Sequence, residues 1–186
     1  EVRILTGTHQ KHSNKGMAET IQRNIELVGL PAWTEEENNF AKALQKELGG
    51  KEEGYAAKLK PMNAPSAVQV GGGSTDVGEV SLIAPTATLS FPISAPGSIG
   101  HHWSTVTCGY GPTAWKGLNA GSKVLAGTAI DLLTNPKLLG EIKTEFANYS
   151  KEHPYKSFLP ADAQPPLDLN KELMDRYRAS LMEFEN

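Results

Sequence analysis

Two stretches of the sequence carry residue types that could take part in chemistry. The run 71–79 reads Gly-Gly-Gly-Ser-Thr-Asp-Val-Gly-Glu, and the run 97–103 reads Gly-Ser-Ile-Gly-His-His-Trp. Glycines allow backbone N–H groups to approach an anion, and neutral imidazole is a common metal ligand. The chain therefore offers a candidate ligand-binding loop and a candidate metal ligand.

The glycine-rich run has a structural interpretation of equal weight, which is a tight turn beside a sheet. The run lacks the Lys-Ser or Lys-Thr ending of a P-loop, and its spacing does not fit a dinucleotide fingerprint. Asp76 could be a binding carboxylate or could cap the segment that follows it. On the residues alone, the cap is the better explanation.

The adjacent histidines His101 and His102 lie in a glycine-rich loop after an expected strand, where sites tend to lie in α/β folds. Two neighbours on an extended chain point to opposite sides, and a zinc site needs about three or four protein ligands. The other histidines, His9, His12 and His153, form no ligand spacing with this pair. Taken alone, the pair is better explained as surface or hydrogen-bonded histidines.

Five helices are expected from apolar spacing and from capping residues. They run from a cap at Ser13 or Asn14 to Gly29, from a capping box of Thr34 and Glu37 to Gly49, from about Ala114 to Leu133, from the cap Asn135 through Phe146, and around Leu173 to Leu181. Three glycines interrupt the third helix, at about 1 kcal/mol each relative to alanine. Close packing against a neighbouring segment would offset that cost.

Strands are expected at 2–5, at 68–70 and at 86–93, where apolar and polar residues alternate. Several helices with a few apolar strands predict a layered α/β domain. With so few strands, a chain of 186 residues does not make a complete doubly wound sheet. Part of the fold is therefore expected to be missing.

Composition excludes several classes of protein. Charged residues make up 21% and the net charge is -3, with no basic patch, so nucleic acid is not an expected partner. No apolar run approaches the roughly 20 residues that span a bilayer, so no membrane is expected either. The single cysteine, Cys108, rules out an internal disulfide, and without a signal peptide the expected location is the cytoplasm.

A set of motifs recurs in a recognisable order along nearly the whole chain. In sequence letters they are VGLPAWTEE at 28–36, GGSTDVGEVS at 72–81, PT at 85–86, APG at 95–97, GHHW at 100–103, KG at 116–117 and FLP at 158–160. This order resembles the aminoacylase and carboxypeptidase-G type of zinc peptidase family. Within that family it is closest to the branch that acts on p-aminobenzoyl-glutamate.

The resemblance implies a partial αβα sandwich, the second half of a zinc-peptidase-like catalytic domain. Residues 1–8 would be the last strand of a lid or dimerisation domain, and residues 9–186 the C-terminal half of the catalytic domain. The family holds two zinc ions, with manganese or cobalt possible, and its last metal ligand matches His101. His102 stands where a serine is usual. The substrate-binding residues would be Gly72, Gly73, Ser74, Thr75 and Asp76.

The activity that the resemblance implies is metal-dependent hydrolysis of the amide bond of an N-acyl or aminobenzoyl amino acid. The family's His-x-Asp ligands and catalytic Glu-Glu pair do not appear in this sequence. The isolated chain is therefore expected to be inactive and to bind zinc weakly, with His101 facing the same pocket as the loop 72–76. The alternative is a non-catalytic folded fragment or interaction module.

The expected partner is a second copy of the chain or the missing N-terminal half. If half of the catalytic domain is absent, the segment around Leu89 and Phe91 and the helix 115–132 would be left in water. Exposed apolar surface favours association with another chain.

Overall fold

The computed structural model describes residues 4–62 and 75–182, and within these ranges the chain forms seven α-helices and no β-strand. The helices are α1 (Lys15–Val28), α2 (Glu35–Glu47), α3 (Val77–Ile83), α4 (Trp103–Gly109), α5 (Pro112–Thr134), α6 (Pro136–Glu152) and α7 (Lys171–Met182). None of these helices is long and apolar enough to cross a bilayer.

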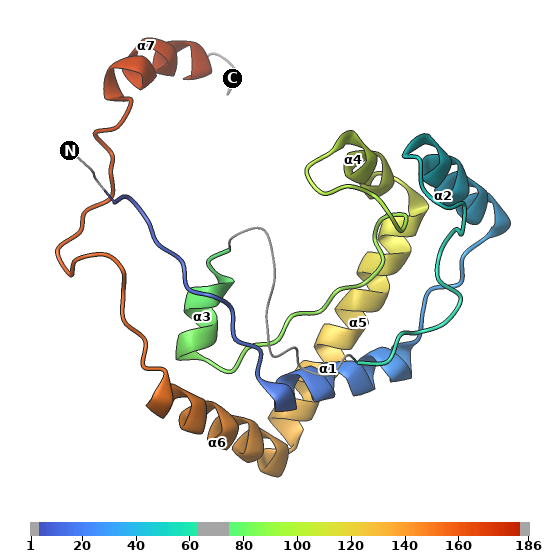
Figure 1. Cartoon of the computed structure of the whole chain (residues 1–186), viewed down its shortest axis with the longest axis horizontal. Coiled ribbons are helices and arrows are strands. Elements are labelled where there is room, and N and C mark those ends of the chain that lie inside the picture. The colour runs from blue at the N-terminus through green and yellow to red at the C-terminus, as the bar shows by residue number, and fades with distance from the viewer. Residues whose placement is uncertain (1–3, 63–74, 183–186) are drawn as a thin grey trace.

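The helices form an open arc, and the long helix α5 makes up one side of it (Figure 1). Helix α5 contacts α1, α4 and α6, whereas α7 lies apart at the end of an irregular segment. The accessible surface is 14003 Å², and a compact monomer of 20.0 kDa would expose about 8,700 Å². The described chain alone therefore does not close around a single core.

The predicted N-caps of α1, α2 and α6 and the predicted end of α1 are confirmed. Asn14 caps α1 by accepting a hydrogen bond from the Met17 amide at 2.9 Å, and Gly29 ends that helix with φ of 73°. Thr34 and Glu37 form the reciprocal capping box of α2. Asn135 caps α6, whose first residue is Pro136. These interactions join residues three positions apart, so they depend only on the local sequence.

The predicted α/β fold, a partial αβα sandwich, is wrong for the described part of the chain. The segment 86–93, where residues alternate, forms no strand and lies along α5, with Leu89 and Phe91 against Gly121. Alternation indicates an extended chain with one buried face, but it does not say what buries that face. Here helix α5 covers that face. No strand in the described ranges pairs with the segment.

The other two expected strands lie partly or wholly outside the described residues. Ile4 and Leu5 are irregular, and the segment 68–70 lies outside the described residues. Two helices, α3 and α4, were not predicted, because seven residues each give too short an apolar pattern to recognise. The division of the chain at residue 8 stays a prediction.

The glycines of α5 confirm the expected close packing. A Cβ placed on Gly117 would overlap the backbone carbonyl of Pro92, and one placed on Gly127 would overlap the side chain of Asn24. Gly121 is different, because a Cβ placed on it would lie 3.5 Å from the Phe91 Cβ, which is an ordinary contact. Gly117 and Gly127 therefore allow the backbone of α5 to approach other segments.

A small buried cluster lies where α2 and α4 meet, and it consists of Ala41, Leu44, Tyr55, Ala95 and Cys108. The Ala95 amide donates a hydrogen bond to the Cys108 Sγ at 3.3 Å. Cys108 is therefore a buried packing residue.

Candidate functional site

The two adjacent histidines have different surroundings. His102 is the N-cap of α4, where its Nδ1 accepts a hydrogen bond from the Ser104 amide at 3.4 Å and lies 3.0 Å from the Ser104 hydroxyl. His101 is exposed, has φ of 57°, and its ring makes no hydrogen bond or ring contact with any described residue. The His102 ring is thus engaged in capping α4, and the His101 ring remains accessible to a ligand.

Only part of the predicted substrate loop can be placed. Gly72, Gly73 and Ser74 lie outside the described residues, and Thr75 and Asp76 are exposed at the start of α3. Asp76 stands at the N-cap position, but its side chain makes no capping hydrogen bond. The carboxylate of Asp76 therefore stays accessible to solvent.

The described residues do not bring these two features into one site. No hydrogen bond or ion pair joins Thr75 or Asp76 to His101 within the described ranges. Figure 1 shows α3 and α4 in separate parts of the arc. Since the loop 72–74 is not described, the shared pocket stays a prediction.

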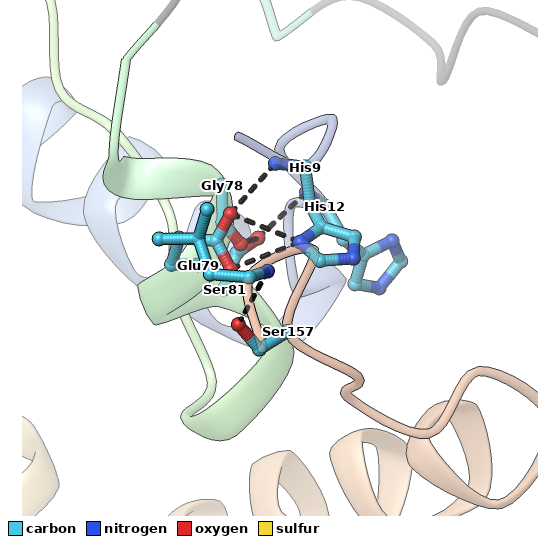
Figure 2. Close-up of polar contacts among 7 residues, drawn as sticks. His9, His12, Gly78, Glu79, Ser81 and Ser157 are labelled. Atoms are coloured by element: carbon cyan, nitrogen blue, oxygen red, sulfur yellow. Dashed lines mark hydrogen bonds and ion pairs between the residues drawn. The ribbon is translucent and has the colours of Figure 1, made fainter. Parts of the chain in front are cut away.

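The second half of the glycine-rich motif anchors the N-terminal segment (Figure 2). The Glu79 carboxylate accepts a hydrogen bond from the His9 amide at 2.8 Å and lies 2.9 Å from the His9 Nδ1. The Ser81 hydroxyl accepts from the His12 amide at 3.0 Å and donates to the Gly78 carbonyl at 2.7 Å. A Cβ on Gly78 would overlap the His9 carbonyl, so only glycine fits there.

The contact between His9 and Glu79 is a histidine–carboxylate pair. The hydrogen bond from the His9 ring holds the pKa of Glu79 below its ordinary value, although burial acts in the opposite direction. A carboxylate on Nδ1 favours the tautomer whose Nε2 is an acceptor. The His9 ring also stacks on Phe158 at 4.1 Å between centroids. Sequence reasoning missed this pair, although Glu79 and Phe158 belong to the recognised motifs.

A second group of rings joins α6 to the N-terminal segment. The ring of His12 stacks on Tyr149 at 3.5 Å between centroids, and Tyr149 stacks on His153 at 4.3 Å. Burial lowers the pKa of His12, and nearby His153 lowers it further, whereas Glu145 opposes both effects. The fold thus favours neutral His12 in the centre of a packed contact.

The motif Lys116-Gly117 connects α5 to other recognised motifs. The Lys116 ammonium donates hydrogen bonds to the Ala32 carbonyl at 2.9 Å and to the buried Glu37 carboxylate at 2.7 Å. Burial disfavours the charged form of Glu37, but hydrogen bonds from Lys116 and Thr34 outweigh this and keep its pKa below the ordinary value. Lys116 therefore reaches the motif 28–36 at Ala32 and forms an ion pair with Glu37, which lies 79 residues away in the chain just after that motif.

The described residues hold no cluster of side chains that could ligate a metal ion. Within residues 4–62 and 75–182, no group of three or more histidine, cysteine, aspartate or glutamate residues could hold a metal ion. Zinc needs about three or four protein ligands. The described residues therefore do not fit a zinc centre by themselves.

Comparison with known proteins gives one relevant likeness. The chain is similar to one of the subunits of p-aminobenzoyl-glutamate hydrolase from Escherichia coli (strain K12), with 27% identity over 175 aligned residues. The alignment covers 82% of this chain and 36% of the relative, so the chain spans about a third of the relative's length. No family model matches the chain, and no solved structure matches it. The likeness supports a distant relationship to a hydrolase.

Proposed function

We propose that the chain is part of a hydrolase that cleaves the amide bond of an aminobenzoyl amino acid or a related N-acyl amino acid. The observation that carries this proposal is the likeness to the p-aminobenzoyl-glutamate hydrolase protein over 82% of the chain. The exposed hydroxyl of Thr75 and carboxylate of Asp76 support it, because both suit polar contact with a substrate. Gly72, Gly73 and Ser74 would complete this substrate loop.

The complete enzyme is proposed to require zinc, or manganese or cobalt in its place, with His101 as one ligand. The accessible ring of His101 and the capping role of His102 support this choice between the two. The remaining ligands would have to come from outside the described residues, because these residues form no metal-binding group of three. We therefore assign no catalytic step to a metal in this chain.

The proposed function is tested with the complete gene product and the 186-residue chain side by side. Each is incubated with p-aminobenzoyl-glutamate, with and without zinc, and released p-aminobenzoate is measured by chromatography. We expect release by the complete product and none by the chain alone. If the complete product cleaves neither this substrate nor other N-acyl amino acids under any metal condition, the proposal is wrong.

A second candidate function is that of an interaction module without a site of its own. The large accessible surface of the chain favours it, and the relative is itself named as one part of an assembly. Calorimetric titration of the chain with zinc separates the two functions only in part, because both predict weak binding. Restored hydrolysis on mixing the inactive chain with the rest of the gene product would favour the enzyme.

A further inference from the structure

Two histidines lie on opposite faces of one tyrosine ring where the N-terminal segment meets the end of α6. His12 stacks on Tyr149 with 3.5 Å between the ring centroids and 6° between the ring planes. Tyr149 stacks on His153 at 4.3 Å and 10°. Two rings this close and this parallel to a third would overlap if both lay on the same face of it. We call His12, Tyr149 and His153 the histidine clasp.

The segment 9–14, which carries His12, also holds helix α3. The His12 amide donates to the Ser81 hydroxyl at 3.0 Å, and the His9 amide donates to the Glu79 carboxylate at 2.8 Å (Figure 2). Among the described helices, the extensive contacts join α1 with α5 and α6, α5 with α6, and α4 with α5, so none of them involves α3. The attachment of α3 therefore depends on the segment 9–14, which the clasp joins to α6.

We propose that the histidine clasp is sensitive to acid, because it holds the segment 9–14 on α6 while its imidazoles are neutral and opens when they are protonated. Neutral rings stack on tyrosine without electrostatic repulsion. A single imidazolium is attracted to the face of a tyrosine, but two of them on opposite faces of one ring repel each other at short range. The His12 ring is also partly buried, so it loses hydration that a cation needs.

The surroundings of His12 favour the neutral ring. Burial has the largest effect and lowers the pKa of His12 from its ordinary value of 6.5. The Glu145 carboxylate opposes this decrease, and His153 adds to it. The two oxygens of Glu145 already accept hydrogen bonds from the Lys15 and Gly16 amides, at 2.7 and 3.0 Å. The remaining effect is a lowered pKa of His12 in the closed clasp.

The direction of this shift gives the sign of the pH dependence. A histidine whose pKa is lower in the closed clasp than in the open one takes up a proton on opening. The clasp therefore contributes its full stability above pH 6.5 and loses it as the pH falls from there through the lower pKa of the closed state. Glu79 on α3 stays ionised in this range, because the His9 hydrogen bond holds its pKa below the ordinary glutamate value.

Opening of the clasp also affects Thr75 and Asp76, and this step alone rests on the proposed function. Both residues directly precede α3, so they move with α3 when it is released. In the proposed hydrolase, the substrate loop would then lose its fixed position in acid. The tests of the clasp measure no hydrolysis, so their outcome does not depend on whether the chain belongs to a hydrolase.

The first test is hydrogen exchange of the 186-residue chain, followed by NMR between about pH 5 and pH 8 and corrected for the intrinsic pH dependence of exchange. The amide of His12 is the probe, because it is bonded to Ser81 while the clasp is closed. We expect its protection to fall below pH 6.5, by up to about tenfold per pH unit for each proton that opening takes up.

Two variants separate the clasp from other effects of acid. His12→Phe keeps a ring that can stack on Tyr149 but cannot titrate, so protection in the segment 9–14 should become nearly independent of pH. His101→Asn is the matched control and should behave like the unmodified chain, because His101 is exposed and makes no ring contact with any described residue. NMR titration of the imidazole protons measures the pKa of His12 directly and needs no variant.

Three results would overturn the inference. Protection of the His12 amide that stays within about twofold from pH 8 to pH 5 would show that the clasp does not open in acid. An unchanged pH dependence in His12→Phe would assign the opening to another group. A pKa of His12 at or above 6.5 in the NMR titration would show that the closed clasp does not favour the neutral ring.

Discussion

Both carboxylate oxygens of Glu79 lie 2.9 Å from the Nδ1 atom of His9, and one of them also accepts a hydrogen bond from the His9 amide. The two residues are 70 positions apart. Glu79 belongs to the glycine-rich motif, so this contact gives one end of that motif a structural role. The N-terminal segment stays beside α3 because of it.

Replacement of Glu79 by glutamine should lower the thermal midpoint at neutral pH. The pKa of Glu79 is below its ordinary value in the folded chain, so ionised Glu79 contributes stability at pH values above the ordinary glutamate pKa. That contribution is lost as the pH falls through the folded pKa, and the two midpoints should then converge. Differential scanning calorimetry between about pH 3 and pH 8 measures this, because the range brackets the glutamate transition.

Glu141→Gln is the control for that experiment, because Glu141 is exposed on α6. Its midpoint should follow the unmodified chain at each pH. A constant difference between Glu79→Gln and the unmodified chain down to pH 3 would contradict the assigned role of the ionised carboxylate.

Replacement of Lys116 by methionine should destabilise the chain by about 1–3 kcal/mol, because it leaves the Glu37 carboxylate buried without its cation. Urea denaturation followed by circular dichroism measures the free energy of unfolding. The double variant with Glu37→Gln should recover part of the loss. Lys123→Met on the same helix is the control, since Lys123 is exposed. An equal loss of unfolding free energy in Lys123→Met would show that the ion pair does not cause the effect of Lys116→Met.

Two glycines of α5 should respond to alanine in opposite directions. Gly117→Ala should destabilise the chain by at least about 1 kcal/mol, because the added Cβ meets the rigid backbone of Pro92. Gly121→Ala has room for the Cβ and should be neutral or stabilising by up to about 1 kcal/mol, from helix propensity. Urea midpoints of the two variants test this, and equal effects would refute the close approach at Gly117.

If the chain is part of the proposed hydrolase, His101→Ala in the complete protein should remove most of the hydrolysis of p-aminobenzoyl-glutamate. His102→Asn should retain it, because asparagine is also a good N-cap and preserves the start of α4. Glu36→Ala should be nearly silent, since Glu36 is an exposed residue in the first turn of α2. Initial rates at saturating substrate measure the effect, and loss of activity in His102→Asn alone would move the proposed ligand to His102.

The sequence by itself determined where α1, α2 and α6 begin. Each of these starts depends on partners three residues apart, which are the N-cap Asn14, the capping box of Thr34 and Glu37, and the N-cap Asn135. Such contacts form within one turn of helix and need no distant segment. The same local reasoning predicted the need for close packing at the glycines of α5.

Only the tertiary structure decided what the extended segments pack against. The alternation at 86–93 predicts one buried face, and a strand and a chain lying on a helix satisfy it equally well. The pairs His9–Glu79 and Glu37–Lys116 join residues 70 and 79 positions apart, and no spacing rule reaches so far.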